Sequence, residues 1–310
     1  MDVLAVTLAL LAAVANGAAS VLQRRAAMEQ AASEGAGGAP DTCRAVRHAV
    51  RRSARLVRRP FWLAGASALG LSTALQAAAL AVGSMSVVQP LMASELLFTL
   101  LLGTVVFHHR PDGRTWSSFL MLAVGLTLFL AAAGPSPGEG SAEAGAWLLA
   151  GACAAAAVFT LTLVARTVRG ATRTAVLGCA TAVCFACTAG LVKEVAGRIP
   201  DGAEVLKTGY PYVMCGIGLL SLVLLQSTLR AGTLTVSQPA LTLGDALVSV
   251  VLGAVLFGER IAVGAHALPA VAGALLLAAG TVGLSRSPAV AGHWDTAGET
   301  SRESPPGHHR

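Results

Sequence analysis

The chain has 310 residues, of which 22 are Lys or Arg and 16 are Asp or Glu, so only 12% are charged. That is about half the charged share of a soluble globular protein. Apolar residues make up 55% and the mean hydropathy is +0.68, which excludes a soluble enzyme because so few charges could not cover its surface. The net charge of +6 does not indicate nucleic-acid binding, since the positive residues are confined to loops. We therefore expect one polytopic membrane domain.

Nine apolar segments are long enough to cross a hydrocarbon layer about 30 Å thick as helices. Open strands cannot lie in lipid, so the expected fold class is all-α, a transmembrane helical bundle. Ala13-Val14-Ala15 in the first segment resembles a signal-peptide cleavage box, but no Lys or Arg precedes it, and we expect a span there. The expected spans are 3–22, 61–83, 85–107, 115–133, 145–166, 174–192, 210–229, 234–257 and 264–284.

The distribution of Lys and Arg between alternate loops predicts the orientation. With the amino terminus outside, 18 of these residues lie on the inner side and four on the outer side, namely Lys193, Arg198, Lys207 and Arg260. Positive residues are retained on the cytoplasmic side of membranes. The sequence therefore predicts a multi-pass protein of the plasma membrane with its amino terminus outside and its carboxyl terminus in the cytoplasm.

The connection 23–60 is a basic loop on the predicted inner side. Its arginines alternate with apolar residues at helical spacing, which fits a helix lying on the anionic inner leaflet. The alternative is a solvated run that only holds the loop inside. Residues 285–310 have no apolar period and are expected to form a disordered cytoplasmic tail. The seven arginines of this predicted helix are Arg44, Arg47, Arg51, Arg52, Arg55, Arg58 and Arg59.

Two parts of the chain match each other at a separation of 150 residues. On this register a single transporter domain, 1–284, contains repeat A (3–133, including the basic loop), a connector helix (145–166) and repeat B (174–284). Equivalent spans are five apart, an odd number, so the repeats are inverted, as is typical of secondary transporters. Chance similarity between Ala- and Gly-rich segments is the alternative. The matched pairs are Gln76 and Gln226, Glu95 and Asp245, Gly103 and Gly253, Phe107 and Phe257, and Arg110 and Arg260, with a weaker match of 19–23 to 189–193.

Two carboxyls lie about midway along predicted spans, Glu95 in the third and Asp245 in the eighth. An acid at the bilayer centre costs about 3 kcal/mol on insertion scales, so it is a functional candidate by default. Each could couple transport to protons, or bind a cationic substrate while ionised. The alternative is a neutral acid hydrogen-bonded to a neighbouring helix.

Amides and prolines also recur in the two repeats. Gln76 and Gln226 are candidates for polar lining of a substrate site, or for hydrogen bonds between helices. Two Gln-Pro pairs precede the acids by about six residues and are candidate kinks whose freed carbonyls could coordinate a cation. A proline in the first turn could instead simply start its helix. These pairs are Gln89-Pro90 and Gln238-Pro239.

No phosphate loop, Ser-His-Asp set or metal-ligand spacing is visible in the sequence, so we expect neither an enzyme nor a cofactor, and we assign no metal ligands. Cys184-x-x-Cys187 lacks a second pair and a nearby His. We interpret both cysteines as small packing residues.

Two related stretches resemble the EamA-like drug/metabolite transporter superfamily. The first consists of Leu75-Gln76-Ala77-Ala78-Ala79-Leu80, then Val87-Val88-Gln89-Pro90-Leu91 and Glu95. Its echo runs from Val236-Ser237-Gln238-Pro239-Ala240 to Gly258-Glu259-Arg260. The nine spans and the first helix ending in Gly17-Ala18-Ala19-Ser20-Val21-Leu22-Gln23-Arg24-Arg25 are more similar to NIPA-type magnesium transporters. The first copy has Phe107-His108-His109-Arg110 in place of Phe257-Gly258-Glu259-Arg260.

This resemblance implies a secondary-active transporter that moves a small solute or cation by alternating access, with a NIPA-like magnesium transporter as the alternative. A hypothesis from another class is a non-transporting scaffold or sensor that uses its basic loop to bind lipid or a partner. The sequence leaves a homodimer open.

Overall fold

The computed structural model describes residues 3–34, 60–107, 112–133, 141–199, 205–231, 234–259 and 267–286. Throughout these ranges the chain consists of helices and short connections, without a strand, which confirms the predicted all-α class. In chain order the helices are α1 (Val3–Glu34), α3 (Pro60–Val82), α4 (Met85–Met92), α5 (Glu95–Phe107), α6 (Gly113–Ala133), α7 (Ala144–Thr167), α8 (Gly170–Gly197), α9 (Tyr210–Ala231), α10 (Leu234–Phe257) and α11 (Ala267–Ser285).

The described helices have the length and composition of membrane spans. Eight apolar stretches among them are long enough to cross a bilayer, with α4 and α5 together forming one of these. The apolar part of α11, Leu268–Leu284, is shorter. Because helices satisfy their own backbone hydrogen bonds, they are suited to lipid. The chain is therefore a multi-pass membrane protein.

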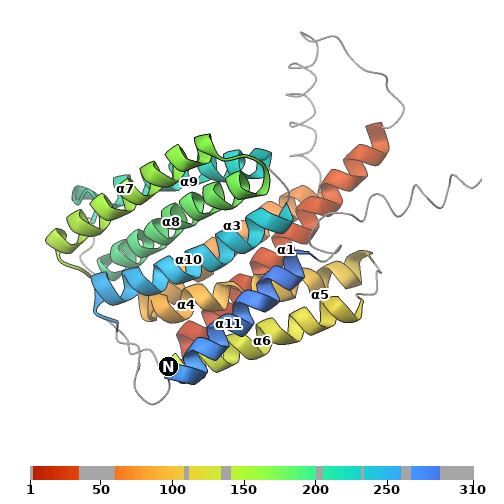
Figure 1. Ribbon diagram of the computed structural model, residues 1–310, viewed down its shortest axis with the longest axis horizontal. Helices are drawn as coiled ribbons and strands as arrows, with labels where there is room; N and C mark the ends of the chain where they lie inside the picture. The colour runs from red at the N-terminus through yellow and green to blue at the C-terminus, as the bar shows by residue number, and fades with distance from the viewer. Residues whose placement is uncertain are drawn as a thin grey trace, which may run out of the picture.

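The helices form two groups with α4 between them. Figure 1 shows α7, α8, α9 and α10 on one side, and α1, α5, α6 and α11 on the other. Within the first group α8 packs along α7, α9 and α10; in the second, α1 packs along α3 and α5, and α6 packs along α11. The short helix α4 contacts both α1 and α10. It therefore joins the two groups near the middle of the bundle.

Some helix ends differ from the predicted span ends. Helix α1 continues twelve residues beyond position 22, through good helix formers such as Ala26 and Glu29, because hydropathy marks where lipid ends and not where a helix ends. Helix α8 likewise continues beyond position 192 to Gly197. The arginines from Arg44 to Arg59 and the predicted tail from 287 onward lie outside the described residues.

The predicted span 85–107 is divided into two helices. Helix α4 ends at Met92, two residues after Pro90, and α5 begins at Glu95. A proline lacks an amide hydrogen and crowds the preceding turn, which weakens a helix. Here the Ser94 hydroxyl donates to the Leu91 carbonyl at 2.6 Å, so a side chain satisfies part of the break. Pro239 causes no such break, because α10 runs through it without interruption.

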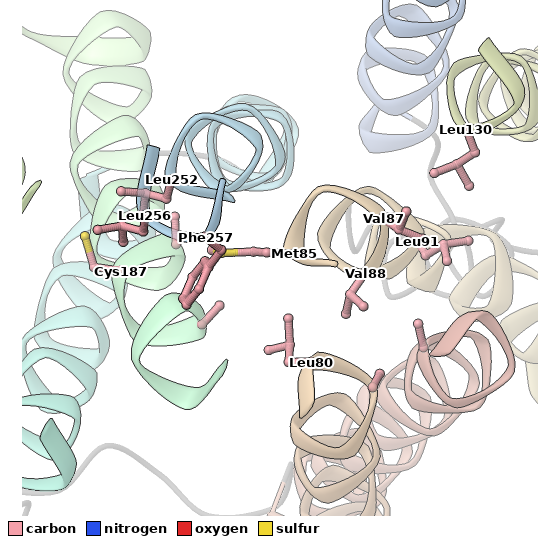
Figure 2. Packing of buried hydrophobic residues seen from close by; sticks show 14 of the residues in the cluster. Leu80, Met85, Val87, Val88, Leu91, Leu130, Cys187, Leu252, Leu256 and Phe257 are labelled. Carbon is pink, nitrogen blue, oxygen red and sulfur yellow. The ribbon is translucent and has the colours of Figure 1, made fainter. Parts of the chain in front are cut away.

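The apolar core lies where α3, α4, α8 and α10 meet. Figure 2 shows Leu80, Met85, Val88, Leu252 and Phe257 in this region, with Met85 reaching from α4 towards the ring of Phe257. Met85, Val88 and Phe257 are almost completely buried. Burial of such side chains excludes both lipid and water from the junction between the two groups of helices.

Glycines allow α6 and α11 to pack with their backbones almost in contact. A Cβ atom added to Gly125 would lie 2.3 Å from the Leu277 amide nitrogen, and one added to Gly280 would lie 2.4 Å from the Leu122 amide nitrogen. Close approach through small residues is a common way to associate helices in lipid. A larger residue would have to separate these two helices.

We expect Gly125→Ala to destabilise the protein by about 1–3 kcal/mol, because the added methyl group overpacks the contact with α11. The matched control is Gly216→Ala in α9, where an added Cβ would meet nothing within 4 Å. Thermal unfolding of the purified protein in detergent measures both. If Gly125→Ala unfolds at the same temperature as Gly216→Ala, the close packing of α6 on α11 is wrong.

Candidate functional site

The two predicted carboxyls lie on neighbouring elements of the bundle. Glu95 is the first residue of α5, directly after the break, and Asp245 lies near the middle of α10. Helix α4, which is separated from Glu95 by two residues, packs along α10. The acids that the sequence placed in two separate spans therefore belong to adjoining parts of the structure.

A third polar residue, Asn16 of α1, joins this site. Its Nδ2 donates a hydrogen bond to Oε2 of Glu95. The next residue, Gly17, permits this approach, because a Cβ atom there would lie 2.9 Å from the Thr99 amide nitrogen of α5. Asn16 is not among the site residues predicted from the sequence, although it is an amide inside an apolar span, as Gln76 is.

Several polar atoms of this region have no hydrogen-bond partner within the described part of the chain. These buried atoms are Nε2 of Gln89, Oδ1 of Asp245 and Oγ of Ser249. Ser249 follows Asp245 by one helical turn on the same face of α10, and Gln89 lies on α4, which packs against α10. Buried polar atoms are normally satisfied by protein groups, water or ligands. Two acceptor-capable oxygens and an amide donor are thus available to a bound solute.

The remaining predicted polar candidates are less central. Gln76 is half-buried on α3, and Gln238 is half-buried near the start of α10. Gln226 lies on the exposed face of α9, whereas its neighbours Leu224 and Thr228 point inward. Thr228 there shares a hydrogen bond with Thr181 of α8 at 3.0 Å. The register of α9 therefore keeps Gln226 away from the carboxyls, contrary to its predicted role as polar lining.

Side chains of the metal-binding types do not gather in this region. Over the described ranges, no group of three or more His, Cys, Asp or Glu residues could hold a metal ion. Cys184 and Cys187 are buried on α8 and are not bonded to each other. Their burial agrees with the interpretation as packing residues.

Near the ends of α8 and α10 lies a buried group of polar residues that we call the end cluster: Met85, Ser86, Lys193 and Glu259. The Glu259 carboxylate accepts hydrogen bonds from the Met85 and Ser86 amides at 2.6 and 2.8 Å, and from the Ser86 hydroxyl at 2.5 Å. Lys193 Nζ lies 2.5 Å from Oε1 of the same carboxylate. Glu259 and Lys193 are 3% and 4% exposed. The carboxylate therefore caps the amino terminus of α4 and forms a buried ion pair.

Glycines make room for this carboxylate. Gly258 has a φ of 62°, a conformation that other residues rarely adopt, and it ends α10 so that the chain turns back. The Glu259 amide then donates to the Gly253 carbonyl at 3.1 Å. A Cβ atom on Gly253 would lie 2.4 Å from Glu259 Oε2.

A second buried carboxylate stands beside the end cluster. Glu194, fully buried on α8, accepts from the Ala142 amide at 2.9 Å, from Trp147 Nε1 at 3.0 Å and from Arg198 Nε at 2.6 Å. Sequence analysis placed Lys193 in an outer loop and did not single out Glu194. The structure corrects this, because α8 extends past both residues. The adjacent Lys193 and Glu194 directly after the predicted span 174–192 were the sequence signal for these buried ion pairs.

An apolar groove of about 700 Å³ lies between α7, α8 and α9. Trp147 and Tyr210 line it, with ring centroids 6.1 Å apart, and so does Phe159. Cys184 and Cys187 of α8 also line the groove, as does Leu252 of α10.

Comparison with known proteins found one similar sequence, and no match among family models or solved structures. The chain is similar to an uncharacterized protein of Corynebacterium glutamicum, with 28% identity over 207 residues, which is 65% of this chain and 70% of that protein.

We expect Asn16→Ala to destabilise the protein by about 1–2 kcal/mol, because it removes the hydrogen bond to Glu95. In a Glu95→Ala background the same substitution should cost much less, since the interaction is already absent. Ser20→Ala, one turn further along α1 and exposed, is the matched control. Thermal unfolding of the four variants in detergent gives the coupling, and additive effects of Asn16→Ala and Glu95→Ala would contradict the contact.

Proposed function

We propose that the protein is a secondary-active transporter of the drug/metabolite transporter type, which moves a small solute or cation by alternating access. The observation that carries this proposal is that Glu95 and Asp245 lie inside a membrane-length helical bundle, on helices that adjoin α4, beside buried polar atoms that lack partners in the described residues. An acid in a membrane interior is costly and is retained mainly where ions, protons or substrates bind. Two of them on adjoining elements favour a transport role over packing alone.

The arrangement of the helices is consistent with a 4+1+4 inverted repeat, which forms part of the proposal. In this scheme α7 is the connector, and α11 is the ninth span. Helix α1 packs along α3, as its proposed counterpart α8 packs along α9. Likewise α4 and α5 contact α1, as α10 contacts α8, while α6 and α11 pack on each other. Such pseudo-symmetry lets two halves exchange conformations around a central site.

The division of a span into α4 and α5 also supports the proposal. Broken helices at mid-membrane expose backbone groups, and they occur where the chain lines a cavity or substrate site. The break ends at Glu95, so irregular backbone and an intramembrane acid occur at the same depth. In the ionised form these carboxyls would attract a cation, and in the neutral form they would carry protons.

A magnesium transporter of the NIPA type is a second candidate for the same site. Mg²⁺ usually keeps several water ligands and is held by one or two carboxylates. The site offers two carboxylates, Glu95 and Asp245, with the Asn16 amide beside Glu95. That ligand set suits a partly hydrated Mg²⁺ better than it suits Zn²⁺, which prefers nitrogen and sulfur ligands.

The carboxyl pair predicts the result of neutralisation. In proteoliposomes loaded with a pH-sensitive or Mg²⁺-sensitive dye, we expect Glu95→Gln with Asp245→Asn to lower proton-coupled or Mg²⁺ flux at least about tenfold, because both proton exchange and cation binding need the acids. The same variant should lose the increase in unfolding temperature that the transported ligand gives the wild type. Mg²⁺, other divalent cations and small protonated amines are the ligands to compare.

Glu143→Gln serves as the control, since Glu143 precedes α7 and lies away from the site. Unchanged flux in the double variant would contradict the role of the acids. Absence of flux for every ligand in the wild type would favour the non-transporting scaffold or sensor.

The proposed orientation has the amino terminus outside and the carboxyl terminus in the cytoplasm, with the arginine-rich loop next to the anionic inner leaflet. The support is the bias of Lys and Arg towards that side.

Cys43 tests this orientation. We expect an impermeant thiol reagent to leave Cys43 unlabelled in intact cells and to label it in inside-out vesicles. As a control, Lys207→Cys in a Cys43→Ser background should show the opposite pattern, because Lys207 is exposed at the other end of the bundle. Labelling of Cys43 from outside the cell would invert the topology.

A further inference from the structure

We infer that the end cluster is the closed outer gate of the transporter, in which the Glu259 carboxylate of repeat B holds the amino terminus of α4 in repeat A and must release it during each cycle. This inference rests on the proposed function and orientation, under which the ends of α3, α8 and α10 face outward. The residues of the end cluster lie outside the carboxyl site of the proposed function.

The contact joins the two halves of the molecule. Met85 and Ser86 belong to α4 in repeat A, whereas Lys193 and Glu259 belong to α8 and the end of α10 in repeat B. The Glu259 carboxylate thus holds a helix terminus of the other half, while Lys193 of its own half balances its charge. Separating the halves at this end requires the three donors of Met85 and Ser86 to leave Glu259.

The end cluster lies directly between the outer end of the bundle and the carboxyl site. Helix α10 runs from Asp245 to Gly253, next to Ser86, over eight residues, or about 12 Å of helix. Apolar side chains complete the barrier, since Met85 is 0% and Phe257 is 1% exposed. Lys193 Nζ also stacks 4.6 Å from the centre of the Phe257 ring. No solute can reach Asp245 from this end while these contacts persist.

Helix α4 is the element that the gate would move. It is eight residues long, and Ala93 and Ser94 join it to α5 through a turn whose amides donate to the Pro90 and Leu91 carbonyls. A tilt of α4 would bend the span at this turn. Its amino-terminal amides need an acceptor wherever they lie in lipid. Glu259 supplies this acceptor in the closed state, and water entering from outside would supply it in the open state.

The end cluster has no sequence counterpart in the other repeat. By the repeat, the counterparts of Lys193 and Glu259 are Gln23 and His109, which form no lysine–glutamate pair. The packing of these helices differs as well: α10 packs along α4, whereas no comparable contact joins α10 to α5 in the described residues. Helices α6 and α11 also join the halves, and their contact extends to Gly283 beside Ser118.

Thiol accessibility tests the gate. In a variant without native cysteines, Ser249→Cys places a thiol below the end cluster and one turn from Asp245. An impermeant methanethiosulfonate reagent is applied to intact cells and, separately, to inside-out vesicles. We expect Lys193→Met to raise the outside labelling rate at least about tenfold, because loss of one partner from a buried ion pair favours the open state.

A second variant and a matched control accompany Lys193→Met. Gly253→Ala leaves every charge in place but displaces the Glu259 carboxylate, and it should raise outside labelling as well. Lys207→Met removes an exposed positive charge at the same end and should leave labelling unchanged. Size-exclusion chromatography and thermal unfolding verify that each variant is folded. Unchanged labelling in folded Lys193→Met and Gly253→Ala, or an equal rise in Lys207→Met, would overturn the gate.

The same samples separate this inference from the proposed function. If flux in proteoliposomes depends on Glu95 and Asp245 but accessibility does not respond to Lys193→Met, the protein is a transporter and the gate is wrong. If accessibility rises and no Mg²⁺, proton or amine flux is found in the wild type, the gate stands and the transport proposal fails.

Discussion

A carboxylate withdrawn from water must be met by hydrogen-bond donors or opposite charge, and the structure meets this constraint in two different ways. Glu259 and Glu194, near the ends of the helices, each have three or four donors within hydrogen-bond distance. Glu95 has a donor in Asn16, while one oxygen of Asp245 has no partner in the described chain. The saturated acids fasten helices together. The acids of the spans keep oxygen atoms that water, a proton, an ion or a solute could still satisfy.

The short helix α4 depends on one of these carboxylates. A helix leaves its first amides without partners inside the helix. Glu259, which follows α10, accepts from the Met85 and Ser86 amides, while at the other end of α4 the Ala93 and Ser94 amides donate to the Pro90 and Leu91 carbonyls. The backbone amides of α4 are thereby satisfied from a distance of more than 170 residues along the chain. A short helix whose cap belongs to another part of the protein is fixed only as long as that contact lasts.

Much of the fold could be predicted from the sequence, because lipid imposes a strong constraint on composition. The apolar segments marked the helices, and two acids in predicted spans marked the candidate site. Other features depend on tertiary contacts that hydropathy does not contain. Lys193 counts as a loop charge in a topology prediction, yet α8 carries it into a buried ion pair because Glu259 is there to receive it. Gln226 matches Gln76 in the sequence repeat, but the register of α9 turns it outward. Asn16 carries the same sequence signal as Gln76, but its partner Glu95 is set by the close approach of α1 to α5 at Gly17.

The departures between the two repeats are more informative than their similarities. A perfectly symmetric inverted repeat would have equal gates at both ends and equal free energies for its two states. Here Glu259 stands where the first copy has His109, and Lys193 where the first copy has Gln23. Under the proposed alternating access, the contact of Glu259 with α4 would stabilise only one of the two closed ends. A substrate bound at Glu95 and Asp245 would then have to supply differential binding energy to open that end. The proposed gate therefore assigns the ligand-dependent step of the cycle to opening on the outer side.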